Sequence, residues 1–147
     1  MKYGRFPKAR LLSRAGQVST PRWKWVAEQS VLAIHDEQLA EHGGRPGVRD
    51  LSLVQPALDQ PRNLAAHGTP DVAELAAAYA FGISKNQGFL DGNKRTAFVV
   101  ACVFLLDHGY ELVASEHEAV TTMLAVAASE MPEAELAVWF RGYIRPN

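Results

Sequence analysis

The chain of 147 residues is long enough for one domain with a single apolar core, and 48% apolar with 21% charged residues is ordinary for a globular protein. The formal net charge of −1 conceals an uneven distribution: residues 1–27 carry seven basic side chains and no acidic one, whereas residues 28–147 carry eight basic and sixteen acidic ones. Such an acidic body disfavours general binding to nucleic acid, because attraction to phosphate supplies most of that affinity.

Cysteine content and hydropathy set the expected compartment. The single cysteine, Cys102, excludes a disulfide within the chain and a cysteine-based metal site, and it favours a reducing environment. No apolar run approaches the roughly 20 residues that span a bilayer, and the N-terminus lacks the apolar region of a secretory signal. We therefore expect a cytoplasmic protein without a membrane segment.

The charge distribution also predicts the domain organisation. We expect residues 1–20 to be a basic, poorly ordered extension and residues 21–147 to form one domain, since no internal repeat or low-complexity segment follows. A role for the extension in binding nucleic acid or membrane is the alternative. The extension has neither the interleaved aromatic residues nor the helical periodicity that would favour this alternative.

Helix signals begin near residue 20. Thr20-Pro21 is typical of a cap followed by proline at the first helical position, and it predicts a helix that ends at Gly43-Gly44. Three glycines and one proline predict a loop over residues 43–50. A short helix over residues 51–59 should follow, with Pro56 tolerated only near its first turn.

The second half of the chain is also predicted to be helical. Thr69-Pro70 repeats the cap-then-proline signal, and Ser115 with Glu118 forms a capping box. Further elements are expected over residues 71–85 (helix), 93–108 (helix, apolar on every face and so buried at the centre of a bundle), 110–114 (extended), 115–129 (helix) and from Pro132 onward (helix). The sequence therefore predicts an all-α fold.

A polar cluster, Asp91 to Arg95, directly precedes the nine apolar residues Phe98 to Leu106. The first backbone N–H groups of a helix lack internal acceptors and carry partial positive charge, so with Lys94 and Arg95 they describe a phosphate site. Asp91 fits such a site when it holds Mg²⁺ that bridges to phosphate. In the alternative interpretation, Asp91 caps the helix and both basic side chains are simply solvated. A P-loop is excluded, because Asn93 stands where its second glycine belongs.

The segment "NQGFLDGNKRTA" resembles the Fic/Doc signature, His-x-Phe-x-(Asp/Glu)-(Gly/Ala)-Asn-x-Arg. The matching residues are Phe89, Asp91, Gly92, Asn93 and Arg95. The stretches "IHDEQLAEHGGRPGVRD" and "FLLDHG" are similar to the death-on-curing (Doc) branch, so that the resemblance spans about Trp25 to Tyr143. It implies a Fic/Doc-type helical bundle with a central buried helix, about 93–108, and a flap loop at 43–50.

The resemblance implies a role for each residue of the polar cluster. Asp91 would coordinate Mg²⁺, and Gly92 and Asn93 would form the anion-binding turn with their backbone and the asparagine side chain. Lys94 and Arg95 would hold phosphate, and Arg95 would also stabilise charge during group transfer. The implied cofactors are ATP, as a substrate, and Mg²⁺.

The resemblance also implies how a target protein is held. Phe89 would anchor the loop in the core, and Gly47, Val48 and Arg49 of the flap would hold the target segment in extended form by strand addition. The implied function is that of a Doc-like toxin of a toxin-antitoxin system, which transfers phosphate from ATP to a hydroxyl of a target protein. Elongation factor Tu is the implied target and a Phd-like antitoxin the implied partner. Fic-type transfer of a nucleoside monophosphate is the alternative.

The sequence departs from the signature at its first position, where Gln87 replaces the histidine that acts as general base, and Gly88 replaces a frequent proline. An amide has no basic nitrogen, and loss of a general base costs on the order of 10²–10⁴ in rate. Three interpretations stay open: a pseudoenzyme that keeps nucleotide or antitoxin binding, a detoxifying substitution, or slow transfer.

Two further expectations concern residues outside the signature. His35 and His42, seven residues apart, are expected to pack and to end a helix respectively, and none of the five histidines is placed to replace the base. The nearest approach to the inhibitory Fic motif, (Ser/Thr)-x-x-x-Glu-(Gly/Asn), is Ser129 to Glu133, which is followed by Ala134. We therefore expect no inhibitory helix within the chain.

Overall fold

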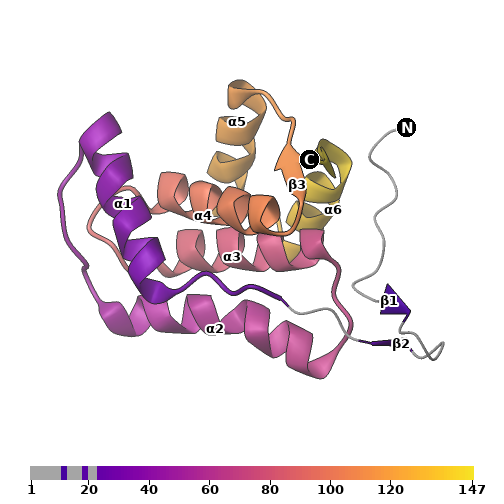
Figure 1. The fold of residues 1–147 in the computed structure, drawn as a ribbon. Coiled ribbons are helices and arrows are strands. Elements are labelled where there is room, and N and C mark those ends of the chain that lie inside the picture. The colour runs from indigo at the N-terminus through magenta and orange to yellow at the C-terminus, as the bar shows by residue number, and fades with distance from the viewer. Residues whose placement is uncertain (1–10, 13–17, 20–22) are drawn as a thin grey trace.

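The computed structural model of the chain describes residues 11–12, 18–19 and 23–147 (Figure 1). The Thr20-Pro21 signal and nearly all of the expected basic extension lie outside the described residues. Two short strands precede the helical body: β1 (Leu11–Leu12) pairs with β2 (Val18–Ser19) in antiparallel register.

The all-α fold predicted from the sequence is confirmed. The elements of the body are α1 (Glu28–His42), α2 (Leu51–His67), α3 (Val72–Asn86), α4 (Asn93–Asp107), β3 (Tyr110–Leu112), α5 (Glu116–Ala127), α6 (Glu133–Tyr143) and β4 (Ile144–Pro146). Helices α2, α3 and α4 lie in successive layers, α1 crosses α4, and α6 packs against α3 (Figure 1). Within the described residues, no helix has both the length and the hydropathy that crossing a bilayer requires.

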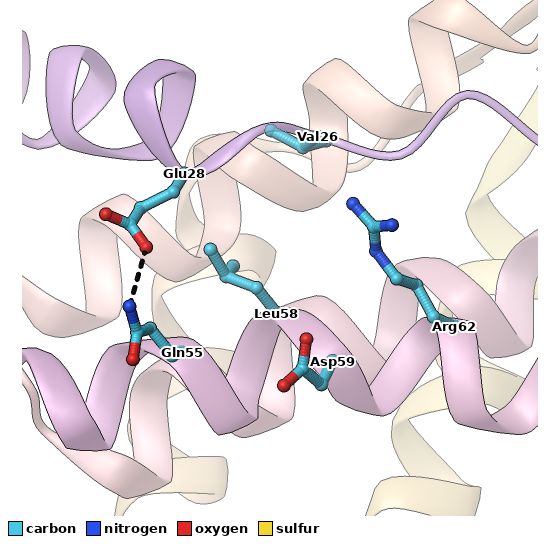
Figure 2. Close-up of a pocket in the computed structure, with 6 residues that line it drawn as sticks. All are labelled: Val26, Glu28, Gln55, Leu58, Asp59 and Arg62. Atoms are coloured by element: carbon cyan, nitrogen blue, oxygen red, sulfur yellow. Dashed lines mark hydrogen bonds between the residues drawn. The ribbon is translucent and has the colours of Figure 1, made fainter.

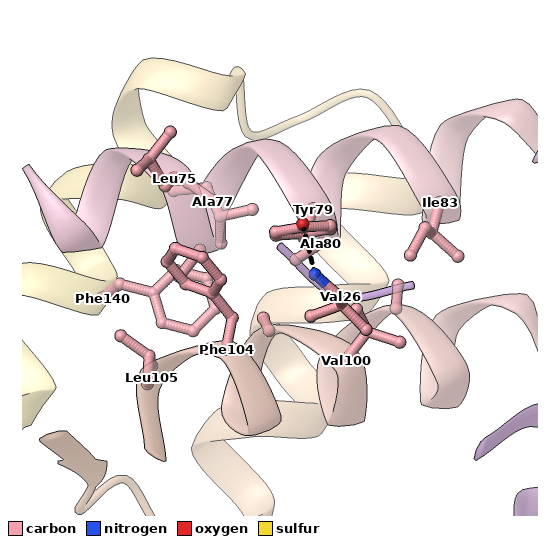
Figure 3. Close-up of a cluster of buried hydrophobic side chains, with 14 of the residues drawn as sticks. Val26, Leu75, Ala77, Tyr79, Ala80, Ile83, Val100, Phe104, Leu105 and Phe140 are labelled. Carbon is pink, nitrogen blue, oxygen red and sulfur yellow. Dashed lines mark hydrogen bonds between the residues drawn. The ribbon is translucent and has the colours of Figure 1, made fainter. Parts of the chain in front are cut away.

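Helix α3 is the most completely buried element because alanine lets its neighbours approach closely. Ten of its fifteen residues are buried, and the rings of Tyr79, Phe104 and Phe140 fill the space between α3, α4 and α6 (Figure 3). The Tyr79 hydroxyl accepts a hydrogen bond from the backbone N–H of Val26 at 2.9 Å, so its polar atom is satisfied inside the core (Figure 3). This core fixes the ends of α3 and α4.

Helix α4 lies in the middle of the bundle, as predicted, although its faces are not equally covered. Residues such as Val100, Ala101 and Phe104 are fully buried, whereas Leu106 is 51% exposed. The apolar run therefore provides one buried face against α3 and two flanks that are partly covered by α1, α5 and β3.

The predicted start of the first helix is wrong, because residues 23–27 are extended and α1 begins only at Glu28. The rings of Trp23 and Trp25 stack on Phe104 with centroids 6.1 and 6.2 Å away. Packing of these two partly buried indole rings on α4 accounts for the extended segment, since tertiary contacts commonly override local helix signals.

The predicted end of the second helix is also wrong, because α2 runs from Leu51 to His67 and not to residue 59. The helix contains Pro56 and Pro61, each of which removes a backbone donor. Its buried residues, Val54, Ala57, Leu58 and Pro61, form one stripe against α3. Packing of this stripe offsets the cost of the prolines, since tertiary contacts commonly override local propensity.

Two capping boxes fix helix starts. Asp71 and Glu74 form one at α3, so the cap is Asp71 and not Thr69 as predicted. Ser115 and Glu118 form the predicted one at α5. The extended piece expected near residue 110 is β3, which pairs antiparallel with β4, a strand that the sequence analysis missed.

Candidate functional site

The candidate site is the loop of residues 87–92, which reverses the chain between α3 and α4. Gln87 ends α3 in the left-handed conformation, with φ 51° and ψ 51°, and Gly92 begins α4 with φ 76°. A left-handed residue costs a non-glycine side chain about 1–2 kcal/mol. Other contacts must therefore hold the loop in this form.

The side chain of Asn93 closes the loop from inside. The backbone N–H of Phe89 donates to Asn93 Oδ1 at 3.1 Å, and Asn93 Nδ2 donates to the carbonyl oxygen of Phe89 at 3.0 Å. The Phe89 side chain is 2% exposed and lies in the core. The side-chain amide of Asn93 is therefore occupied by bonds within the loop. At the start of α4, the group that Asn93 presents is its backbone N–H.

A buried histidine supports the loop from α1. The ring of His35 stacks on Phe89 with centroids 3.8 Å apart, and His35 Nε2 lies 2.8 Å from the carbonyl oxygen of Asp91. A carbonyl oxygen only accepts, so Nε2 carries the proton and donates. The sequence predicts that His35 packs, but it gives no signal for the contact with Asp91, which lies 56 residues away along the chain.

The Asp91 carboxylate is partly exposed and already faces a cation. Its Oδ2 atom accepts a hydrogen bond from the backbone N–H of Arg45 at 3.0 Å, and the Nε atom of Arg45 lies 3.7 Å away. The Arg45 backbone N–H and, secondarily, the positive charges of Arg45 and Arg95 hold the pKa of Asp91 below its usual value. Asp91 is therefore ionised at neutral pH.

The start of α4 presents backbone donors and basic side chains together. The first bond of the helix runs from the N–H of Thr96 to the carbonyl oxygen of Gly92 at 3.0 Å, so the N–H groups of Asn93, Lys94 and Arg95 have no acceptor within the helix. The side chains of Lys94 and Arg95 are exposed. Partial positive charge at the helix start and two full charges favour an anion here.

The loop over residues 43–50, which we call the flap, is bonded to the candidate site. The N–H groups of Arg49 and Asp50 both donate to the carbonyl oxygen of Gly88, at 2.7 and 3.0 Å, and the N–H of Leu90 donates to the carbonyl oxygen of Gly47 at 3.2 Å. These bonds flank an antiparallel bridge between Val48 and Phe89. In such a pair the N–H and C=O of Val48 point away from the site loop, toward the outer edge of the flap.

Arg49 of the flap also reaches the motif position that departs from the family signature. Its Nε and one terminal nitrogen donate to the carbonyl oxygen of Gln87, at 3.0 and 2.7 Å, while the Gln87 residue itself is exposed. The guanidinium group thus holds the backbone of residue 87 and leaves its side chain at the surface. The resemblance assigns Arg49 to target binding, and the sequence gives no signal for this contact with Gln87.

Gly88 is explained by its close approach to α2. A Cβ atom on residue 88 would lie 2.4 Å from Val54 Cγ2 and 3.1 Å from Val54 N. The distance to Val54 Cγ2 is shorter than real contacts allow and the distance to Val54 N is tight, so a larger residue would force Val54 or the loop to shift. The glycine that replaces the frequent proline at this position therefore matches the close packing of the loop against α2 in this chain.

The donor set of the site is compatible with a magnesium ion held together with phosphate. Among the described residues, no group of three or more His, Cys, Asp or Glu side chains is arranged so that it could hold a metal ion by itself. Mg²⁺ typically uses one or two carboxylates and completes its shell with water and substrate phosphate, so the single carboxylate of Asp91 fits this ion. A zinc site of several nitrogen or sulfur ligands does not fit.

A separate pocket of about 290 Å³ lies between the segment that precedes α1 and helix α2 (Figure 2). It is lined by Val26, Glu28, Gln55, Leu58, Asp59 and Arg62. Gln55 closes one side by donating to Glu28 Oε1 at 3.2 Å (Figure 2). The pocket shares no lining residue with the loop of residues 87–92.

The fold and the site define the class of this protein: an all-α domain that displays a glycine-containing polar turn at the start of a largely buried helix. Residues 25–105, more than half of the chain, match the model of the Fic/DOC family. The chain belongs to this family, as the motif predicted.

Two curated proteins are similar to the chain. It is 27% identical over 88 residues to "Protein kinase doc" of Escherichia phage P1, which covers 59% of this chain and 70% of that protein. It is 36% identical over 75 residues to "Toxin Doc" of Mycolicibacterium smegmatis, which covers 49% of this chain and 57% of that protein. Both relatives belong with the Doc branch that the sequence resembles.

Proposed function

We propose that the chain is a Doc-like toxin whose site binds ATP with Mg²⁺ and transfers the terminal phosphate to a hydroxyl of a target protein. The observation that carries this proposal is the meeting of unbonded helix N–H groups, exposed Lys94 and Arg95 and ionised Asp91 at one helix start. The names of the two relatives, a protein kinase and a toxin, agree with it.

Each residue of the polar turn has a part in this proposal. Asp91 would hold Mg²⁺, which neutralises phosphate charge when bound. The backbone N–H groups of Gly92 to Arg95 would bind phosphate oxygens, with Lys94 and Arg95 as countercharges. Arg95 would also stabilise the charge of the phosphate during transfer. The Asn93 side chain would act indirectly, because its amide is bonded to Phe89.

Gln87 limits the chemistry of the site. An amide can hydrogen-bond the target hydroxyl but cannot accept its proton, so activity should fall by on the order of 10²–10⁴ relative to a histidine at this position. Binding should persist, since the groups that hold phosphate do not include residue 87. Phosphoryl transfer depends mainly on positioning and charge stabilisation, which leaves room for slow transfer.

The target would be held by the flap. The outward N–H and C=O of Val48 offer an edge for an extended segment, and the side chains of Val48, Leu51 and Leu90 beside it are 40%, 39% and 38% exposed. Elongation factor Tu in the cytoplasm is the proposed target, and a Phd-like antitoxin the proposed inhibitor.

One substitution tests the catalytic proposal. The Gln87→His variant should be toxic in cells and should label a lysate protein from γ-labelled ATP, whereas Gln87→Ala should show no more toxicity or labelling than the parent chain. Label retained from the α-phosphate would instead identify nucleotidyl transfer. Calorimetry with Mg·ATP tests binding separately. Absence of a binding signal would contradict the proposed phosphate site.

A second candidate function rests on Gln87 alone. A chain without a base could serve as a pseudoenzyme that binds nucleotide or antitoxin without transfer. If Gln87→His gains neither toxicity nor labelling while Mg·ATP still binds, this second function is the better one.

A further inference from the structure

The first part of the flap, residues 43–45, contacts both charged groups of the candidate site; we call it the flap root. The backbone N–H and the guanidinium group of Arg45 face the Asp91 carboxylate, at 3.0 and 3.7 Å. A terminal nitrogen of Arg95 donates to the carbonyl oxygen of Gly43 at 3.1 Å. The flap root therefore bonds to both groups that the proposed function assigns to the ligand, the Asp91 carboxylate and the Arg95 guanidinium group.

The chemistry of these contacts matches that of the proposed ligand. A cation, Arg45, lies on the carboxylate that would hold Mg²⁺, and a carbonyl oxygen, that of Gly43, lies on the guanidinium group that would hold a phosphate oxygen. We propose that the flap root is an internal competitor of Mg·ATP, which occupies Asp91 and Arg95 in the free protein and is released when the ligand binds. This inference rests on the proposed function.

The flap root is seated closely enough to compete. Gly44 has φ 128°, and a Cβ atom there would lie 2.9 Å from Leu39 Cδ2 and 3.2 Å from Asp91 Cβ. The backbone of residue 44 therefore lies directly against α1 and Asp91, in a conformation and a space that favour glycine. The N–H of Gly43 donates to the carbonyl oxygen of Leu39 at 2.7 Å, which ties the root to the end of α1.

The contacts of the flap root are also weak enough to be released. The Arg45 side chain is 74% exposed and that of Asp91 48%, and ion pairs this exposed are weak because water screens them. A ligand that brings a divalent cation and several phosphate oxygens offers Asp91 and Arg95 stronger partners. The root therefore sets a modest penalty on binding and does not block the site permanently.

The remainder of the flap should stay in place when the root is released. Gly47, Arg49 and Asp50 are bonded to the backbone of Gly88 and Leu90, and none of these bonds involves Asp91 or Arg95. Movement should thus be confined to residues 43–46. The edge at Val48 would remain available to a target.

Calorimetry gives the sign of the effect. Loss of a positive charge near an anion site ordinarily weakens anion binding, but the competitor model predicts that Arg45→Ala binds Mg·ATP about two- to fivefold more tightly. The control is Arg62→Ala, which removes an exposed positive charge on α2 away from Asp91 and should leave the affinity unchanged. Weaker binding by Arg45→Ala would make Arg45 an ordinary phosphate contact and overturn the inference.

Hydrogen exchange in the parent chain gives an independent readout. Saturating Mg·ATP should speed exchange of the Arg45 amide, whose acceptor is Asp91, while the amides of Arg49 and Leu90 keep their protection. Binding of Mg·ATP with an unchanged Arg45 amide and equal affinities would overturn the inference and leave the proposed function intact. If neither the parent chain nor Arg45→Ala binds Mg·ATP, the proposed function and the inference both fail.

Discussion

The guanidinium group of Arg49 donates two hydrogen bonds to the backbone carbonyl oxygen of Gln87, at 3.0 and 2.7 Å. Residue 87 is left-handed, so its conformation carries a cost that these bonds help to offset. A side chain of the flap thereby controls the direction in which the side chain at the proposed base position leaves α3.

Arg49→Met should remove both bonds and loosen the loop. We expect a loss of about 0.5–1 kcal/mol in the free energy of unfolding, because the donor is charged but both bonds lie at the surface, where water can replace it, with faster amide exchange at Leu90. Arg49→Lys should recover part of the loss, since an ammonium group can still donate to the Gln87 carbonyl. If the Arg49→Met protein is as stable as the parent and its amide exchange is unchanged, the two bonds from Arg49 to Gln87 have no energetic role.

Gly88→Ala should destabilise the protein by about 1–3 kcal/mol, the usual cost of inserting an atom into packed space. The added Cβ would lie 2.4 Å from Val54 Cγ2, so Gly88→Ala should cost less stability in a Val54→Ala background, which is itself destabilised by the loss of buried methyl groups, than in the parent. Gly142→Ala is the matched control: nothing lies within 4 Å of a Cβ there, and in helix α6 alanine should stabilise by about 0.5–1 kcal/mol. Urea unfolding of the four proteins decides whether the clash or the loss of a glycine is responsible.

Asn93→Ala should cost about 1–3 kcal/mol, because the N–H and C=O of Phe89 both lose their partners in a partly buried place. Asn93→Asp should retain the bond from the Phe89 N–H but set a carboxylate against the Phe89 carbonyl oxygen. Its stability at neutral pH should therefore lie between those of the parent and Asn93→Ala, and thermal unfolding would measure it. Equal stability of all three proteins would contradict a structural role for the amide.

Burial raises the pKa of the Cys102 thiol to about 12. The thiol should remain protonated in the native protein at pH 8 to 9 and react slowly with a disulfide reagent, and reaction should become fast in denaturant. The pKa of the thiol is higher in the folded than in the unfolded protein. Its contribution to the free energy of unfolding is therefore fully present below the unfolded pKa of about 9 and is lost progressively as the pH rises toward 12. Rapid labelling of the native protein at pH 8 would contradict this environment.

The parts of the fold that the sequence predicted are those that depend on neighbouring residues. The Ser115 capping box, the helix end near Gly43 and the start of α4 at Asn93 are each set by interactions within a few residues. The continuation of α2 past Pro61 and the extended segment of residues 23–27 depend on packing against distant helices, for which the local sequence has no signal.

The candidate site divides in the same way. Asp91 to Arg95 are contiguous and lie on one turn, so the sequence located them together. The contacts that shape this turn come from far along the chain, from His35, Arg45 and Arg49. Sequence periodicity could place these three residues in a helix or a loop, but not against Asp91 or Gln87.

The groups that hold the loop at residue 87 are distinct from the side chain of that residue, which occupies the proposed base position. The loop is held by the backbone carbonyl of Gln87, by the backbone of Gly88 and by the amide of Asn93, while the Gln87 side chain is exposed. An exchange of glutamine and histidine at this position should therefore carry little stability penalty in either direction. Under the proposed function, a histidine introduced at residue 87 would therefore add a base to a site that is already folded, so that gain or loss of catalysis and stability of the scaffold can be separated by one codon.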